Sequence, residues 1–166
     1  PDAQLLTSLG LATFRTSDER YLTNAGLLCV GRAEAIARWL PTHEVRFQVL
    51  DDGGALLTNE SLRTPLLLVL DQVQQRFESR NQEAEIHTGL VRIGIPDYPR
   101  ESFREGLLNA VVHRDYARHQ PVLIQMHPER LVIASPGGFP AGVTLDNLLV
   151  HEPVARNPRL AETFLR

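Results

Sequence analysis

The sequence contains no lysine, because all 17 of its basic residues are arginine. A Walker A loop, a Schiff-base site and the catalytic lysine of a protein kinase each require a lysine side chain. These three kinds of site are absent from the chain, and a P-loop helicase motor is therefore excluded from these 166 residues.

Cysteine and long apolar runs are also scarce. Cys29 is the single cysteine, so it cannot form an internal disulfide, and no paired Cys or His spacing predicts a zinc site. We therefore expect a reducing, cytoplasmic compartment. Apolar runs such as 66–70 are too short to span a membrane, and no signal peptide is recognised. Because the chain opens at Pro1, we expect it to be part of a longer protein.

Composition and charge are those of an ordinary globular domain. Apolar residues make up 43% and charged residues 22%, and the length suits one domain. A net charge of -3 gives no general basic surface for nucleic acid. We expect any contact with DNA to come from other parts of a longer protein.

Hydrophobic periodicity predicts an α+β chain. Helices are predicted at residues 2–9, 23–30, 33–40, 64–80, 99–113 and 144–149, and from 157 onward. Strands are predicted at 44–49, 55–62, 85–95, 121–127 and 130–135. This order favours a two-layer sandwich in which the helices at 64–80 and 99–113 cover one face of a mixed sheet. We divide the single domain into a helical lead-in (1–42), a core (43–135) and a lid with the last helix (136–166).

The helix predicted at 99–113 carries a line of polar residues. Glu105, Asn109 and His113 follow one another at intervals of four, so they share one helix face. A carboxylate, an amide and an imidazole in line can hold Mg²⁺ and order a water, and a carboxylate can act as a general base. The same pattern is typical of the solvated side of an amphipathic helix, and spacing alone leaves both interpretations open.

A glycine-rich turn follows the strand at 130–135. Ser135 and Pro136 precede Gly137 and Gly138, and glycines allow the backbone to approach a ligand closely. Exposed amides in such a turn can cradle an anion, although a Pro-Gly-Gly sequence is also common in plain turns.

Other residues are weaker candidates. The tripeptide 113–115 matches the start of a kinase catalytic loop, but the chain lacks the remaining kinase motifs. We expect Trp39 to pack beneath a short helix. The arginines that flank the polar helix could contact phosphate or could be solvated charges; they are Arg100, Arg104, Arg114 and Arg118. The remaining histidines are expected at surface or strand positions; they are His43, His87, His119, His127 and His151.

Four segments carry a resemblance to a known family. They are Leu22-Thr23-Asn24-Ala25-Gly26-Leu27-Leu28, Arg104 to Tyr116 (REGLLNAVVHRDY), Ile133 to Pro140 (IASPGGFP) and Val154-Ala155-Arg156-Asn157-Pro158. In order and separation they resemble the C-terminal region of bacterial proteins described as RecG-related ATP-dependent DNA helicases or as Schlafen/Alba-domain transcriptional regulators. The resemblance covers nearly the whole chain.

The resemblance implies a GHKL ATPase fold, shared with gyrase, Hsp90 and histidine kinases, and ATP and Mg²⁺ as cofactors. It implies that Glu105 positions the attacking water, that Asn109 binds Mg²⁺, and that Gly137 and Gly138 receive the adenine end. His113 and Ser135 are also expected to bind the cofactor. The GHKL turn has an Asp that bonds adenine, and Ser135-Pro136 stands in its place here. Residues 139–156 would form the lid.

Three hypotheses follow. The chain is a regulatory nucleotide-binding module of a DNA-binding transcription regulator, or an ATP-hydrolysing domain of a DNA-processing protein. The third hypothesis is a GHKL scaffold that has lost nucleotide binding and serves in homodimerisation or protein interaction. All three place DNA contact in other domains and none involves a membrane.

Overall fold

The computed structural model describes residues 3–14, 19–89, 91–140, 142–147, 150, 152 and 154–164. The expected surface position of His151 therefore lies outside the described residues. Six helices are assigned within these ranges: α1 (Ala3–Ser8), α2 (Asn24–Val30), α3 (Ala33–Trp39), α4 (Leu66–Glu78), α5 (Arg100–His113) and α6 (Pro158–Phe164). The strands are β1 (Ala12–Phe14), β2 (Arg20–Leu22), β3 (Val45–Leu50), β4 (Leu56–Leu62), β5 (Glu83–Thr88), β6 (Val91–Pro96), β7 (Val122–Met126) and β8 (Leu131–Ala134).

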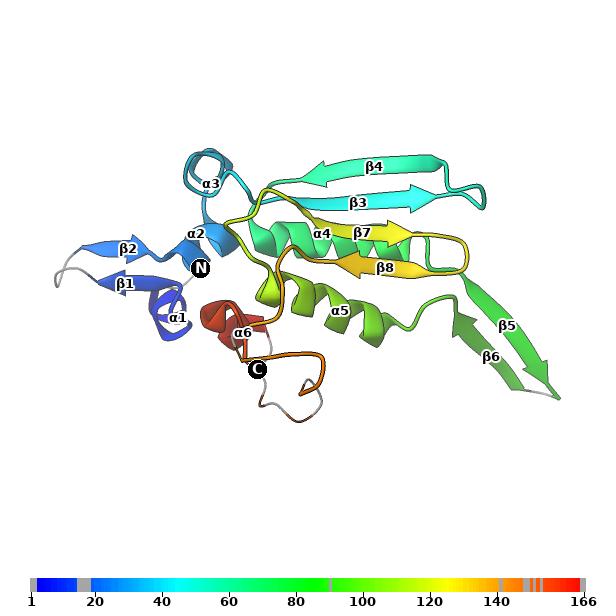
Figure 1. The fold of residues 1–166 in the computed structure, drawn as a ribbon. Helices are drawn as coiled ribbons and strands as arrows, with labels where there is room; N and C mark the ends of the chain where they lie inside the picture. The colour runs from blue at the N-terminus through cyan, green and yellow to red at the C-terminus, as the bar shows by residue number, and fades with distance from the viewer. Residues whose placement is uncertain are drawn as a thin grey trace.

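The main sheet is mixed and has the strand order β4-β3-β7-β8. β3 and β7 run parallel, while the outer pairs are antiparallel hairpins. Helices α4 and α5 lie side by side on one face of this sheet (Figure 1). The predicted α+β sandwich is thus confirmed, including the two helices that cover the sheet.

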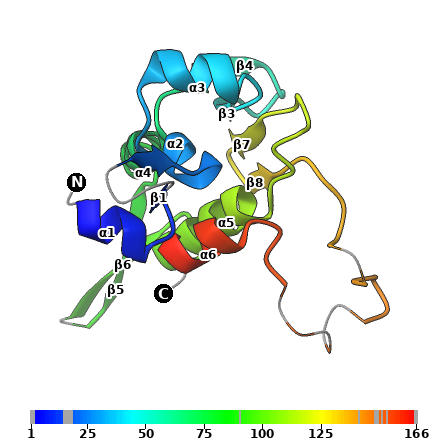
Figure 2. The ribbon, with the colours of Figure 1, turned by 90° about the vertical axis from the view of Figure 1, so that its left-hand side faces the viewer.

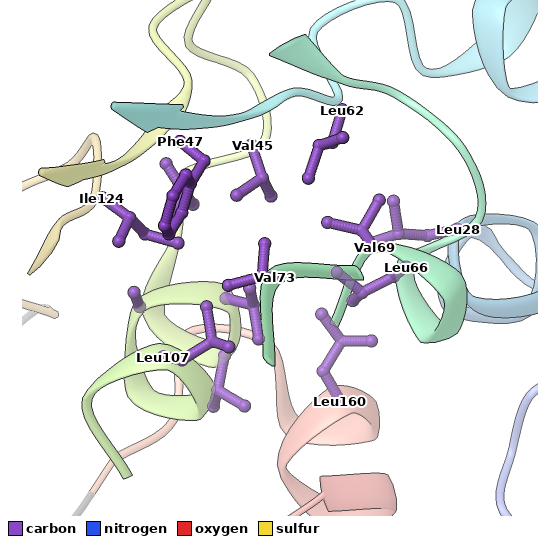
Figure 3. Close-up of a cluster of buried hydrophobic side chains, with 14 of the residues drawn as sticks. Leu28, Val45, Phe47, Leu62, Leu66, Val69, Val73, Leu107, Ile124 and Leu160 are labelled. Carbon is purple, nitrogen blue, oxygen red and sulfur yellow. The ribbon is translucent and has the colours of Figure 1, made fainter. Parts of the chain in front are cut away.

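Alternation along the central strands creates the core. Val45 and Phe47 of β3 and Val122 and Ile124 of β7 point toward the helices and are buried, whereas Gln48 faces outward. Figure 3 shows Phe47 and Ile124 of the sheet facing Leu107 of α5. Between the helices, the rings of Phe77 and Phe103 stack with their centroids 3.7 Å apart. This packing fixes α5 along the inner face of the sheet.

A buried arginine joins the end of α5 to the start of the sheet. Arg114 is only 1% exposed, and its guanidinium donates hydrogen bonds to the carbonyl oxygens of Thr42, Glu44 and Gln120. The guanidinium also lies 4.9 Å from the ring centroid of Tyr116. One side chain therefore links carbonyl oxygens of the segments that enter β3 and β7, and the carbonyl oxygen of Glu44 also accepts from the Val122 backbone N–H (3.0 Å).

Two small hairpins differ from the predicted elements. The single strand expected over 85–95 is a hairpin of β5 and β6 that turns at Gly89 and projects from the body (Figure 1). The φ of Gly89 is +62°, and this conformation allows the tight turn that the alternation pattern did not register. The predicted helical lead-in over 1–42 also contains the β1–β2 hairpin, whose three-residue strands are too short for a periodic signal.

Three local predictions were wrong. Trp39 is 66% exposed and lies under the guanidinium of Arg38 instead of beneath a helix. His43 is 2% exposed, not at the surface, and its Nε2 is 2.8 Å from the carbonyl oxygen of Thr64. The described residues of the helix expected over 144–149 form turns, in which the Asn147 side chain accepts from the Thr144 amide (2.7 Å). A side chain that bonds local backbone competes with helix formation.

Replacing Arg114 by alanine should lower the free energy of unfolding by about 3 kcal/mol, since it leaves three carbonyl oxygens without their charged donor. Urea denaturation monitored by circular dichroism measures this. Arg104→Ala, on the exposed side of the same helix, is the matched control and should change stability by less than about 0.5 kcal/mol. Equal effects of the two substitutions would contradict the structural role of Arg114.

Stability should fall as the pH drops below about 6.5. Burial lowers the pKa of His43, and the Arg114 charge adds to this effect. Below this pH, His43 binds a proton in the unfolded chain but stays neutral in the native protein, so the free energy of unfolding decreases. In His43→Gln, urea denaturation at pH 7.5 and 5.5 should show a smaller difference than in the wild type. Glu44 does not interfere, because its arginine partners outweigh the effect of burial and lower its pKa, which places its titration below this range.

Candidate functional site

The polar face of α5 (Glu105, Asn109 and His113) is exposed along its whole length. Successive members are rotated by about 40° around the helix axis, so the three side chains share one side. The side chains of Glu105 and Asn109 have no hydrogen bond or ion pair with another described residue. Their oxygen atoms are therefore free to bind a ligand, and the sequence prediction of a common face is confirmed.

Neighbouring elements border the polar face on both sides. At Gly106 the helix approaches β8 so closely that an added Cβ would come 3.1 Å from Cδ1 of Ile133. On the other side, the Asn157 amide N–H donates to the carbonyl oxygen of Val112 (3.2 Å), which ties the start of α6 to α5. The connection from β8 to α6 (136–157) therefore begins and ends beside this helix, as Figure 2 shows.

The glycine turn (135–140) begins beside Asn109. The Ser135 hydroxyl donates to the carbonyl oxygen of Ala110 (2.7 Å), the residue that follows Asn109. Gly138 is exposed, and nothing lies within 4 Å of the position that a Cβ would occupy there. Gly137 has a φ of +129°, a conformation that favours glycine. The structure thus brings Ser135, Gly137 and Gly138 to the C-terminal end of the helix that carries the polar face.

Asp115 ties three of the sequence motifs together. Its backbone N–H donates to the carbonyl oxygen of Pro136 (2.8 Å), and its carboxylate accepts from the amide of Ala117 (3.1 Å). The carboxylate also pairs with Arg118 (3.2 Å) and lies 3.9 Å from Arg156. The bond from Ala117 and the two arginines hold the pKa of Asp115 below its usual range. Asp115 is therefore held both by backbone groups and by two arginines.

Arg156 and Asn157 complete this junction from the other end of the connection. The guanidinium of Arg156 donates to the carbonyl oxygen of Gly138 (2.9 Å), and Asn157 Nδ2 donates to the carbonyl oxygens of Val112 and Arg114 (2.8 Å each). In the sequence these residues stand in the segment 154–158 that carries part of the resemblance. No local pattern indicates their role, because their partners lie on the glycine turn and at the end of α5, at least 18 residues away along the chain.

The arginines near α5 do not form a shared phosphate-binding cluster. Arg114 is buried in the fold, and Arg100 pairs with Glu78 (2.9 Å) and Glu83 (2.8 Å) at the base of the β5–β6 hairpin. Arg118 is held by Asp115. The interpretation that all four arginines contact phosphate is therefore wrong for Arg114, whose guanidinium a ligand cannot reach.

A cavity that the sequence did not reveal lies between α2 and α6. This α2–α6 cavity has a volume of about 450 Å³. Its lining comes from three of the four segments that carried the resemblance, together with Leu40 and the first residues of α6: Asn24, Ala25, Leu28, Leu40, Tyr116, Arg156, Asn157, Pro158, Arg159 and Leu160. Segments distant in sequence build this space, so no local pattern could have predicted it.

The described residues contain neither a metal-binding side-chain cluster nor a membrane-spanning helix. No group of three or more His, Cys, Asp or Glu side chains there could hold a metal ion by itself. The oxygen atoms of Asn109 and Glu105 still suit Mg²⁺, which usually takes one or two protein ligands beside water and phosphate. None of the described helices is long and apolar enough to cross a membrane.

Comparison with known proteins bears on the C-terminal third of the chain. Residues 119–166 match the family model described as "Putative ATP-dependent DNA helicase recG C-terminal". This match confirms the resemblance to RecG-related proteins that the sequence motifs indicated. It covers β7, β8, the connection and α6, and therefore includes the glycine turn but not α5. No curated protein matches the chain.

The whole chain is similar to a solved structure, that of the DIP2311 protein from Corynebacterium diphtheriae. The two are 29% identical, with a TM-score of 0.81 over 99% of this chain. The chain spans only about a third (32%) of that protein. The similarity supports the α+β architecture, including the parts that lie outside the family match.

Gly137→Ala should destabilise the protein by about 1–3 kcal/mol, because its φ of +129° disfavours a side chain. The added Cβ would also lie 3.2 Å from Cβ of Asp115. Gly138→Ala, the neighbouring control, has open space for its Cβ and should change the melting temperature far less. If the two alanine variants melted at the same temperature, the constraint at Gly137 would be contradicted.

Proposed function

We propose that this chain is the nucleotide-binding module of a RecG-related, DNA-binding bacterial regulator, built on the GHKL fold. ATP with Mg²⁺ is the expected ligand, and it lies along the polar face beside the glycine turn (135–140). One observation carries this proposal: the bond from Ser135 to Ala110 holds the glycine turn next to Asn109. A site for the magnesium and a turn suited to close backbone approach thus lie together.

Residue roles follow from this placement. Asn109 provides an amide oxygen for Mg²⁺, and His113 borders the site one helical turn further on. Gly137 and Gly138 let the base approach the backbone, and Ser135 fixes the turn. Because Ser135-Pro136 replaces the acidic residue of GHKL proteins, adenine would be held mainly by backbone and packing.

Hydrolysis is a second candidate function, favoured by the exposure of Glu105 and its lack of any partner among the described residues. A free carboxylate one helical turn from Asn109 could orient and deprotonate a water. The protein would then be a regulator whose nucleotide state changes with time. DNA contact remains assigned to other domains, in keeping with the net charge of -3.

Isothermal titration of ATP into the full chain, with and without Mg²⁺, tests the proposal. We expect saturable binding that requires Mg²⁺, and Asn109→Ala should weaken it about tenfold or more, since a direct metal ligand is lost. Glu34→Gln on α3, an exposed carboxylate far along the chain, is the control. Absence of binding at millimolar ATP would refute the nucleotide-binding role and leave the scaffold hypothesis.

Phosphate release separates binding from hydrolysis. Glu105→Gln keeps the size of the side chain and removes its basic carboxylate, so turnover should drop about 100-fold or more while ATP affinity stays within about threefold. Equal turnover in the wild type and in Glu105→Gln would exclude Glu105 as the base.

A further inference from the structure

The α2–α6 cavity has the size and lining of a small-molecule site. Its volume of about 450 Å³ lies within the range usual for ligand pockets. Its floor is apolar, formed by Leu28 and Leu160, which are buried, with Ala25, Leu40 and the ring of Tyr116. In Figure 3, Leu28 and Leu160 come from different helices toward the same region of the core.

The charged groups of the cavity are two arginines. Arg156 and Arg159 both line it, and no Asp or Glu occurs among its lining residues. Arg159 is exposed and has no ion pair with a described residue, while its stem lies beside Gly10, where an added Cβ would be 3.7 Å from its Cδ. The Nε of Arg156 is buried and lacks a hydrogen-bond partner among the described residues.

The other polar side chains of the cavity differ in whether they already make hydrogen bonds within the protein. Tyr116 donates its hydroxyl proton to the carbonyl oxygen of Val111 (3.1 Å), and Asn157 Nδ2 is committed to two carbonyl oxygens. Asn24 is exposed at the start of α2 and has no such bond. An apolar floor beside the unpaired guanidinium of Arg159 favours a ligand that has an apolar body and one acidic group.

We propose that the α2–α6 cavity is a second binding site, for a small organic anion with an apolar body, such as an aromatic or aliphatic carboxylate or sulfonate. The acidic group pairs with Arg159, and the body rests on Leu28 and Leu160. This site is distinct from the polar face of α5. It contacts the glycine turn (135–140) through Arg156, whose guanidinium donates to the carbonyl oxygen of Gly138.

Fluorescence titration with 8-anilinonaphthalene-1-sulfonate, an aromatic sulfonate, tests the site in the full chain. Binding should saturate at one molecule per chain. Arg159→Ala should weaken it about fivefold or more, and Ala25→Leu, which fills the floor, should weaken it further. Arg38→Ala, an exposed arginine outside the cavity, should leave the affinity unchanged. An equal affinity in all four proteins would overturn the assignment.

Two further titrations sharpen the result. N-phenyl-1-naphthylamine has the same aromatic body without the sulfonate and should bind at least tenfold more weakly; equal binding would overturn the anionic class of the ligand. Asn109→Ala should not change the affinity for the sulfonate, and ATP with Mg²⁺ should not displace it. Displacement by ATP would instead place the nucleotide in this cavity.

Near-ultraviolet circular dichroism of Ala25→Leu verifies that the variant is folded, with Ala25→Ser as the replacement if it is not.

Discussion

The guanidinium of Arg114 is the interaction on which the arrangement of the site depends. A charge that is 1% exposed is expensive to bury, and here three backbone carbonyls and the ring of Tyr116 compensate for it. Because these carbonyls belong to the segments that lead into β3 and β7, the C-terminal end of α5 is positioned relative to the sheet. The polar face and the glycine turn are held at a fixed distance from each other as a result.

The larger elements were predictable because local sequence patterns, such as helix start signals and strand alternation, indicate each of them. The helices α2, α4 and α5 have clear start signals, and the Thr23 hydroxyl accepts from the Gly26 amide as an N-cap should. The central strands alternate, and burial follows that alternation. The short β1–β2 hairpin and the turn at Gly89 were missed, since strands of three residues and a tight turn leave little periodicity to detect.

The candidate site likewise has features that the sequence predicts and features that depend on tertiary packing. The common face of Glu105, Asn109 and His113 follows from helix geometry alone, and the exposure of all three agrees with it. The burial of Arg114 and His43 could not be derived, because charge and polarity predict exposure unless tertiary partners are known. The α2–α6 cavity is also a tertiary feature, made by helices that lie more than a hundred residues apart in the chain.

The two ends of the connection at 136–157 are anchored independently of its middle. Pro136 and Gly138 are fixed by Asp115 and Arg156, and Asn157 is fixed by the carbonyls of Val112 and Arg114. The entropic free-energy cost of closing a loop rises only by about 0.6 kcal/mol for each doubling of its length. Evolution can therefore lengthen, shorten or rewrite the central residues of this segment without unfolding the domain, and related proteins can differ there in what they recognise.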